Sequence, residues 1–195
     1  MKGNGLLIVI SGPAGAGKGT VVKELVKNDN IKVSVSATTR SPRTGEENGV
    51  HYHFLTREQF QSMINEDGFL EYAEYCGNFY GSPKKQAEEW MNEGKDVILE
   101  IEVQGCTKIK EQNPECVSIF IMPPSMEVLE KRLRGRGTET EDVIIKRLAR
   151  AREEIALAKN YDYIVVNGPI EECVADVLSV INAEKLRAKR FDKTV

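Results

Sequence analysis

The chain is poor in the residues on which metal and redox sites usually depend. Its 195 residues include two histidines, His51 and His53, and four cysteines whose spacings match no zinc or Cys-x-x-Cys motif. We interpret the histidines as structural and the cysteines as buried or partly exposed thiols. The longest apolar run near the start, residues 6–10, is far shorter than a membrane helix of roughly 20 residues or a signal-peptide core of roughly 7 to 15. We therefore expect a cytoplasmic protein.

An excess of positive charge is also missing. The chain has 27 Lys and Arg against 30 Asp and Glu, which gives a formal net charge of -3. A protein with this balance lacks the basic surface that holds a nucleic-acid backbone non-specifically, and we expect no nucleic-acid or membrane partner. The length is that of one domain, since domains usually contain roughly 100 to 200 residues. No repeat or linker divides the chain.

Short apolar segments alternate with amphipathic ones along most of the chain. The apolar segments predict strands at residues 6–10, 33–36, 97–101, 117–121 and 163–166. The amphipathic segments, with Thr56 and Gln59 as a capping box and Ser82-Pro83 as a helix start, predict helices at residues 18–27, 57–66, 83–93, 107–112, 126–133, 141–159 and from 170. This order is typical of an α/β fold of the P-loop NTPase type, with a parallel sheet covered by helices on both faces.

A polar stretch and a hairpin interrupt this alternation. Residues 38–48 have no core pattern, and residues 69–75 and 79–80 predict a hairpin around Gly77 and Asn78. We expect one domain whose core comprises about residues 1–36 and 96–195. The interrupting segment, about residues 37–95, is expected to form an inserted acceptor-binding lobe, and about residues 133–150 a short lid.

A glycine-rich loop follows the first predicted strand and precedes the first predicted helix. Its pattern is that of a P-loop, in which backbone N–H groups and a lysine surround the phosphates of a nucleoside triphosphate. The alternative is a glycine-rich turn with a solvated lysine, but strand, pattern and helix agree independently. The expected ATP-binding residues of the loop are Gly12, Pro13, Ala14, Gly15, Ala16, Gly17, Lys18, Gly19 and Thr20.

The loop departs from the usual pattern at one position. Gly19 stands where a serine or threonine normally ligates Mg²⁺. We expect Mg²⁺ as a cofactor, bound with ATP and held mainly by phosphate and water, and assign it no direct protein ligand. Thr20 reaches the metal only if the helix start is shifted. Glu100, at the end of a predicted strand, is a candidate for contact through water, or else a charge that faces a helix.

A P-loop alone leaves GTPases, ATP-driven motors and small-molecule kinases open. Residues 92–96 do not form the Asn-Lys-x-Asp motif that recognises guanine in GTPases. Two basic segments favour a kinase, because phosphoryl transfer needs cations on both substrates. One lies within residues 36–52, and the other within residues 131–152, where eight Lys or Arg accompany three Asp or Glu.

The motifs in and around these segments resemble those of guanylate kinases from Leu7 to about Arg187. The matching segments are the Thr-Thr-Arg-x-Pro-Arg-x-Gly-Glu stretch at residues 38–46, residues 77–82, Gln104-Gly105 and the Arg-Gly-Arg-Gly-Thr stretch at residues 134–138. The resemblance implies a transferase of purine nucleotide metabolism that phosphorylates GMP to GDP with ATP. It makes dGMP the expected second acceptor, and it implies closure of a lid over the substrates.

The resemblance also implies the acceptor site. Guanine would be surrounded by Ser36, Glu71, Ser82 and Glu102, and the GMP phosphate would be held by Arg40, Arg43, Tyr52 and Tyr80. The Glu71 carboxylate suits guanine, since it can accept hydrogen bonds from N1–H and the exocyclic amine together. From the pattern alone, Glu71 could equally be a charge facing solvent on a strand, and the tyrosines could be ordinary half-buried aromatics.

For the donor side, the resemblance makes Asn167 a contact of adenine, and lid arginines approach the ATP phosphates. The expected catalytic residues are Lys18, Arg40, Arg132, Arg136 and Arg147. No general base is expected, because the attacking phosphate oxygen is already anionic. We interpret Arg134, Arg150 and Arg152 as surface charges, and the basic residues 185–190 as a solvated helix end without a function.

Two departures from the family pattern bear on these roles. Glu100-Ile101-Glu102 stands where the family usually has Asp-Ile-Asp, and Gly168-Pro169 replaces an acidic pair after Asn167. Two rival functions stay open at this point. One is a kinase with another phosphorylated acceptor on the same scaffold, and the other is a non-catalytic interaction module. The sequence predicts no oligomeric state.

Overall fold

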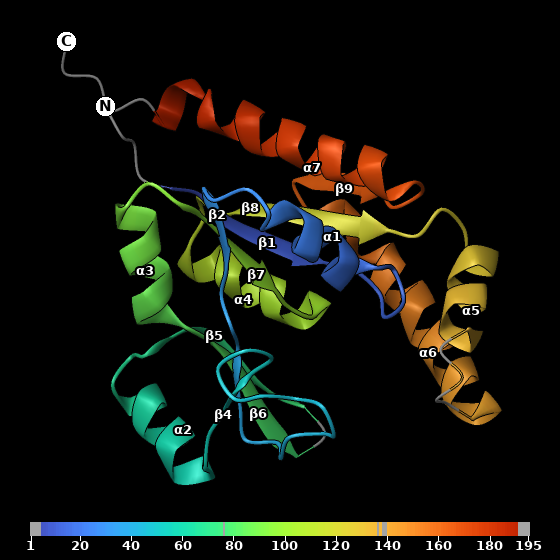
Figure 1. The fold of residues 1–195 in the computed structure, drawn as a ribbon, viewed down its shortest axis with the longest axis horizontal. Helices are drawn as coiled ribbons and strands as arrows, with labels where there is room; N and C mark the ends of the chain where they lie inside the picture. Colours follow the sequence, from blue (N-terminus) through green and yellow to red (C-terminus); the bar gives the residue numbers. More distant parts are fainter. Residues whose placement is uncertain (1–4, 76, 136, 138–139, 191–195) are drawn as a thin grey trace.

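The computed structural model describes residues 5–75, 77–135, 137 and 140–190. Its centre is a five-stranded sheet in which every neighbouring pair of strands is parallel (Figure 1). The strand order is β2-β7-β1-β8-β9. Their bounds are β1 Leu7–Ser11, β2 Ile31–Val33, β7 Asp96–Glu100, β8 Val117–Met122 and β9 Tyr163–Val166. The predicted parallel sheet is therefore confirmed.

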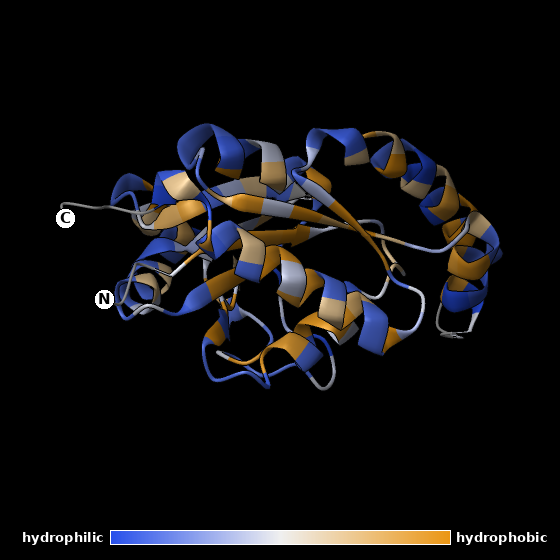
Figure 2. Cartoon of the chain, turned by 90° about the horizontal axis from the view of Figure 1, so that it is seen from above, coloured by the Kyte–Doolittle hydropathy of each residue, from blue (hydrophilic) through white to orange (hydrophobic). Residues whose placement is uncertain are grey.

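Helices cover both faces of this sheet, as predicted. Successive side chains of a strand point to opposite faces. Ile8 and Ile10 of β1 accordingly pack in one cluster with α1 (Lys18–Leu25) and α7 (Ile170–Lys185). Leu7 and Val9 pack in another cluster with α3 (Lys84–Asn92) and α4 (Val103–Gln112). Figure 2 shows the hydrophobic strands between helices whose outward sides are largely hydrophilic.

Three of the four cysteines lie in these apolar layers. Cys106, Cys116 and Cys173 are buried free thiols, and burial raises the pKa of Cys116 to about 12. Cys76 lies outside the described residues. None of the described helices combines the length and apolar character needed to cross a membrane.

A second, four-stranded sheet lies below the first in Figure 1 and comes from the interrupting segment. Its order is β4-β3-β6-β5, with β4 His53–Phe54, β3 Ala37–Thr38, β6 Asn78–Pro83 and β5 Phe69–Tyr75. Helix α2 (Arg57–Asn65) packs on it through Phe60, whose ring stacks on Phe69 and Phe79 at centroid distances of 4.4 and 5.4 Å. The predicted capping box of Thr56 and Gln59 is present.

Two helices, α5 (Met126–Arg134) and α6 (Glu141–Ala156), lie together at one end of the molecule (Figure 1). The exposed Arg134 connects them, because its guanidinium donates to Glu130 on its own helix at 2.8 Å and to Glu141 on α6 at 2.5 and 2.7 Å. Arg134 is thus a surface charge with a structural contact. Two short 3-10 turns, Ala158–Asn160 and Ala188–Arg190, complete the chain.

Several predicted boundaries are wrong, including the ends of the helices expected at residues 18–27 and 141–159, which lie at Leu25 and Ala156. The strand expected at residues 33–36 does not exist as one unit, because β2 ends at Val33 and the chain crosses to the other sheet before β3 begins at Ala37. Helix α3 begins at Lys84, since Ser82 and Pro83 still belong to β6. Helix α4 begins at Val103 instead of 107, and Gly105 inside it explains the weak helical signal.

The basic C-terminal end is not simply a solvated helix end. Lys185 forms an ion pair of 2.6 Å with Asp96, which is 1% exposed. Glu184 is equally buried and accepts hydrogen bonds from Tyr163, Arg187 and Arg190. These buried carboxylates attach the end of α7 to the sheet.

Replacing Asp96 tests this attachment. Asp96 also accepts a hydrogen bond from the Leu6 backbone N–H at 3.1 Å, so Asp96→Ala leaves a buried donor unpaired. We expect the free energy of unfolding to fall by about 1 to 3 kcal/mol, measured by urea denaturation. Asp176→Ala, at an exposed position of α7, is the matched control. Equal stability of the two variants would contradict the structural role of Asp96.

Candidate active site

The glycine-rich loop joins β1 to α1 and has the geometry of a phosphate-binding loop. Gly12, Gly15 and Gly17 have φ angles of 145°, 89° and 92°, which side-chain-bearing residues rarely adopt. A Cβ atom on Gly17 would also lie 2.4 Å from Asn167 Nδ2. Gly17 is the N-cap of α1 and offers no side chain to the first helical N–H groups. Those N–H groups and the helix dipole together favour an anion at this point.

Lys18 lies folded over the loop. Its ammonium donates to the carbonyl oxygens of Gly12 at 2.5 Å and Pro13 at 3.3 Å. Helix α1 begins at Lys18, so the shifted helix start that Thr20 would need to reach a metal is not observed. A triphosphate in the loop would replace the two carbonyls as the partner of this ammonium.

The Glu100 carboxylate lies next to the loop, at the carboxyl end of β7. Both of its oxygens are 3.7 Å from the point that a Cβ on Gly19 would occupy. Desolvation by the surrounding protein raises the pKa of Glu100, and the charge of Lys18 opposes that shift. Among the described residues no group of three His, Cys, Asp or Glu could hold a metal by itself. Glu100 is therefore the carboxylate best placed to contact a metal bound to phosphates.

Asn167 and Arg132 both form hydrogen bonds with the glycine-rich loop. Asn167 is 5% exposed, and its Nδ2 donates to the Ala16 carbonyl at 2.7 Å. Arg132, on α5, donates to the same carbonyl at 3.2 Å and to the Asn167 carbonyl at 2.9 Å. The structure thus brings both residues to the predicted triphosphate site. Their hydrogen bonds go to backbone carbonyls and connect the loop with α5 and with the residue that follows β9. The adenine contact expected for Asn167 stays a prediction.

Glu71 lies inside the protein, and the solvent-facing alternative is wrong for it. The residue is 7% exposed, and its Oε1 accepts a hydrogen bond of 2.9 Å from Ser82 Oγ. Burial raises the pKa of Glu71, while the Ser82 hydrogen bond and the charge of Lys108 oppose the shift. Gly105 at the start of α4 leaves room beside Oε2, because a Cβ there would lie 3.2 Å away. Glu71 and Ser82 therefore form one polar site, as expected.

The other two residues expected around the base are Ser36 and Glu102. Ser36 is half-buried, and its carbonyl accepts from the His53 backbone N–H at 2.8 Å. Glu102 is the exposed N-cap residue of α4. Its carboxylate lies 3.4 Å from Arg150 on α6. Arg150 also donates to the buried Glu154 at 2.7 Å, so interpreting Arg150 as a plain surface charge is wrong.

Arg40 is held in place by a residue to which the sequence analysis gave no role. Its guanidinium donates to both oxygens of Glu46, at 2.9 and 3.0 Å, and lies 5.5 Å from the ring centre of Tyr52. The Arg40 hydrogen bonds hold the pKa of Glu46 below its usual value. Tyr52 and Tyr80 meet edge to face at 6.1 Å. The available signal for Glu46 was its place at the end of the Thr-Thr-Arg-x-Pro-Arg-x-Gly-Glu stretch.

The remaining cations predicted for the site are Arg43, Arg136 and Arg147. Glu46 also accepts from the Arg43 backbone N–H at 2.8 Å, while the Arg43 side chain is exposed. Arg147 is half-buried on α6 and Arg152 is exposed. Arg136 lies outside the described residues. The GMP-phosphate contact expected for Arg43 stays a prediction, as do the catalytic roles expected for Lys18, Arg40, Arg132, Arg136 and Arg147.

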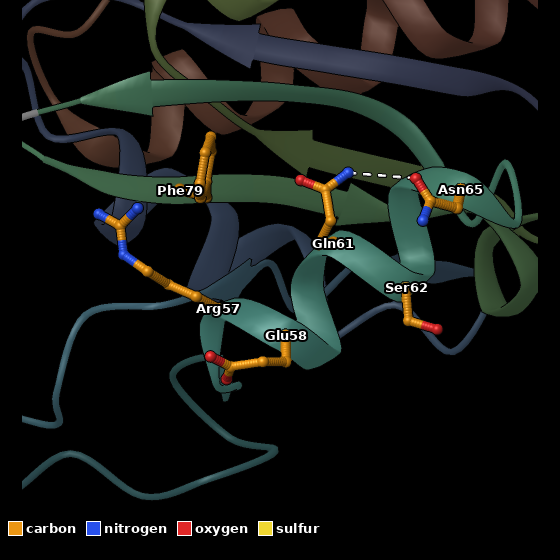
Figure 3. Close-up of a pocket in the computed structure, with 6 residues that line it drawn as sticks. All are labelled: Arg57, Glu58, Gln61, Ser62, Asn65 and Phe79. Carbon is orange, nitrogen blue, oxygen red and sulfur yellow. Dashed lines mark hydrogen bonds between the residues drawn. The ribbon is translucent and has the colours of Figure 1, made fainter.

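A hollow of about 630 Å³ lies elsewhere, on the outer side of α2 (Figure 3). None of the predicted site residues lines it. Arg57 at its edge donates to the Gly77 carbonyl and lies 5.4 Å from the Phe79 ring centre, while Gln61 donates to Asn65 at 3.1 Å. Because Arg57 and Gln61 already donate hydrogen bonds within the protein, the hollow is a weaker candidate for the active site than the loop region.

Comparisons with known proteins agree with the geometry. A family model described as guanylate kinase matches residues 4–184. The chain is 54% identical to a guanylate kinase of Halalkalibacterium halodurans, covering 97% of this chain and 94% of that protein. It is 52% identical to a guanylate kinase of Clostridioides difficile, covering 98% and 94%. The crystal structure of guanylate kinase from Anaplasma phagocytophilum superposes with a TM-score of 0.79 at 39% identity, over 97% of this chain and 90% of that one.

Removing the Asn167 side-chain amide tests whether its hydrogen bond to Ala16 supports the loop. Asn167→Ala deletes a buried donor to Ala16, and we expect the free energy of unfolding to fall by about 1 to 3 kcal/mol. Triphosphate affinity should fall as well, because the loop loses one of its two supports. Binding of a fluorescent ATP analogue and urea denaturation measure the two effects. The neighbouring Gly168→Ala, whose Cβ meets nothing within 4 Å, should change neither, and an unchanged affinity in Asn167→Ala would refute the role.

Proposed function

The chain belongs to the guanylate kinase family, and on that premise we propose how its residues bind the substrates and transfer the phosphoryl group. The enzyme catalyses the ATP-dependent phosphorylation of GMP to GDP. The observation that supports the acceptor site best is the buried Glu71 carboxylate bound to Ser82. Burying a carboxylate is costly, and hydrogen-bond donors from the protein or from a ligand offset that cost.

Guanine can supply further hydrogen-bond donors to the Glu71 carboxylate. Its N1–H and exocyclic amine lie side by side and can both donate to Glu71, whereas adenine presents an acceptor and a C–H at the corresponding edge. Ser82 positions the carboxylate, and Ser36 and Glu102 complete the polar surroundings of the base. Sites that hydrogen-bond a substrate group reject an analogue lacking it by roughly 10⁴ to 10⁵. Glu71 is thus the proposed determinant of guanine specificity.

The acceptor phosphate binds to Arg40, Arg43, Tyr52 and Tyr80 in this proposal. The bidentate contact with Glu46 already holds Arg40 in an oriented state, and a forked guanidinium matches the geometry of a phosphate. Glu46 thereby acts as a positioning residue. Glu46 accepts from two of the five N–H groups of Arg40, and the Ser41 carbonyl accepts from a third at 2.7 Å, so the others can face the phosphate.

ATP binds with its phosphates in the loop between β1 and α1. Lys18 provides charge to them, and Asn167 and Arg132 keep the Ala16 peptide in the orientation that the loop requires. Mg²⁺ fits the residues present, because the Glu100 carboxylate lies beside Gly19. Gly19 itself has no hydroxyl that could ligate the ion. Phosphate oxygens and water, with Glu100 acting through water, would then hold the ion. When bound, Mg²⁺ neutralises charge on the ATP phosphates.

The transfer step needs little covalent help from the protein. A GMP phosphate oxygen attacks the γ-phosphorus in line, a new O–P bond forms, and the bond to the ADP oxygen breaks. The nucleophile is an anion near neutral pH, so no residue must remove a proton. The work of the chain is to place the two nucleotides and stabilise the charge of the transition state, through Lys18, Arg40 and the lid arginines Arg136 and Arg147. Closure of the lid excludes water as a competing acceptor.

A coupled ADP assay tests the activity and its acceptor. With ATP and Mg²⁺, we expect turnover with GMP and dGMP and not with AMP, CMP or UMP. Lys18→Ala should abolish turnover while preserving the fold, and it serves as the control for contaminating kinases. Preference for another monophosphate would transfer the proposal to a kinase with a different acceptor. No turnover with any of them would favour the non-catalytic module.

The pH dependence of Glu71→Gln tests the base contact. Only the ionised carboxylate accepts from both guanine donors, so Glu71→Gln should lower kcat/KM for GMP by about 10- to 100-fold at pH 7.5. The pKa of Glu71 is raised, so the native enzyme should lose this advantage as pH falls, beginning above the usual range of a glutamate. The ratio of KM values between variant and native enzyme should therefore shrink at low pH. Titration of the GMP phosphate affects both proteins equally and therefore cancels in this ratio. A ratio that stays constant with pH would contradict the contact of Glu71 with guanine.

A further inference from the structure

Arg150 connects helix α6, most of which lies in the expected lid segment, with the acceptor side of the active site. It lies on α6, 48 residues after Glu102 in the chain, and its Nη2 is 3.4 Å from Glu102 Oε2. Its Nε donates to Glu154 Oε1 at 2.7 Å on the same helix. The Glu154 side chain is only 9% exposed, while the Arg150 side chain is 36% exposed. One edge of the guanidinium is therefore fixed by a buried carboxylate, and another reaches out to Glu102.

Glu102 is free to respond to this contact. It is the N-cap residue of α4, and its side chain makes no capping hydrogen bond within the part of the chain described. Its exposed fraction is 65% in the side chain. Gly105, one turn into the same helix, lies against Glu71 Oε2. The helix start that carries Glu102 thus borders the polar site of Glu71.

The contact between Arg150 and Glu102 is long enough to become shorter when substrates bind. Charge-assisted N–H···O bonds usually measure roughly 2.7 to 2.9 Å, and the observed 3.4 Å is longer. Arg150 also lies one helical turn after Arg147, so a movement of α6 that brings Arg147 toward ATP displaces Arg150 with it. A carboxylate has lone pairs for two partners at once. Glu102 can therefore bind guanine and Arg150 together.

We propose that Arg150 is a positioning residue that holds the guanine-binding Glu102 and links it to helix α6, so that GMP binding and ATP binding reinforce each other. The inference rests on the proposed function, because it takes Glu102 as part of the guanine site. It assigns a role to a residue outside the Arg-Gly-Arg-Gly-Thr stretch. It also gives the longer carboxylate at position 102 a partner on another element.

Calorimetric titration of GMP, with and without a non-hydrolysable ATP analogue, tests the link. We expect Arg150→Gln to weaken GMP binding by about two- to five-fold, the range of a partly exposed ion pair. The factor by which the analogue strengthens GMP binding should also fall. In steady-state kinetics KM for GMP should rise while kcat changes less. Arg152→Gln removes the same charge from the same helix and should leave all four quantities unchanged.

A double-mutant cycle separates this link from a general effect. Once Glu102→Gln is present, adding Arg150→Gln should weaken GMP binding no further, because their shared contact is already lost. Independent, additive losses would overturn the inference, as would an unchanged GMP affinity in Arg150→Gln or an equal loss in Arg152→Gln. If Glu102→Gln leaves GMP affinity unchanged, the guanine-site assignment itself is wrong, which is a distinct result.

Stability is controlled separately. Arg150→Gln leaves Glu154 buried without its 2.7 Å partner, and an unpaired buried charge destabilises a fold. If thermal unfolding shows such a loss, Arg150→Gln/Glu154→Gln replaces the single variant, with Glu154→Gln as its reference. The same weakening of GMP binding is expected there, and its absence would overturn the link to Glu102.

Discussion

The central parallel sheet, whose inner strands β7, β1 and β8 are buried on both faces, leaves one end where polar groups can meet. The strands run in the same direction, so their carboxyl ends all lie at that end, which is the usual ligand side of such sheets. The P-loop leaves β1 there, Glu100 ends β7 and Asn167 follows β9. The contacts of Ala16, Lys18 and Glu100 all depend on this arrangement. The phosphate site is thus a consequence of how the strands are covered.

Four charged groups of the active site have a second feature in common, which is a partner within the protein. Lys18 binds backbone carbonyls and Arg40 binds Glu46. Glu71 binds Ser82 and Glu102 lies near Arg150. Such partners offset the cost of desolvating a charge and hold its side chain near one orientation. Substrates then meet groups that are already oriented, and less conformational freedom is lost on binding.

Sequence reasoning succeeded where the signal is local. The P-loop, the capping box at Thr56 and the hairpin of β5 and β6 each depend on residues close together in the chain. Pairing Glu71 with Ser82 depended on resemblance to a family. The Arg40–Glu46 contact was missed although it is local. Asn167 and Arg132 were placed at the site, but their hydrogen bonds to Ala16 were missed, because these cross 151 and 116 residues. A single sequence contains no record of such pairings, and the break between β2 and β3 likewise reflects a change of sheet that local propensity does not encode.

The contact of α7 with Asp96 has a consequence for the order in which the protein folds. Asp96 begins β7 beside the centre of the sheet, yet its charged partner Lys185 comes from the last turn of α7. Before α7 packs, Asp96 has its hydrogen bond from the Leu6 backbone N–H but lacks an ionic partner. Burying this carboxylate in the sheet and packing α7 beside α1 are therefore coupled steps of folding.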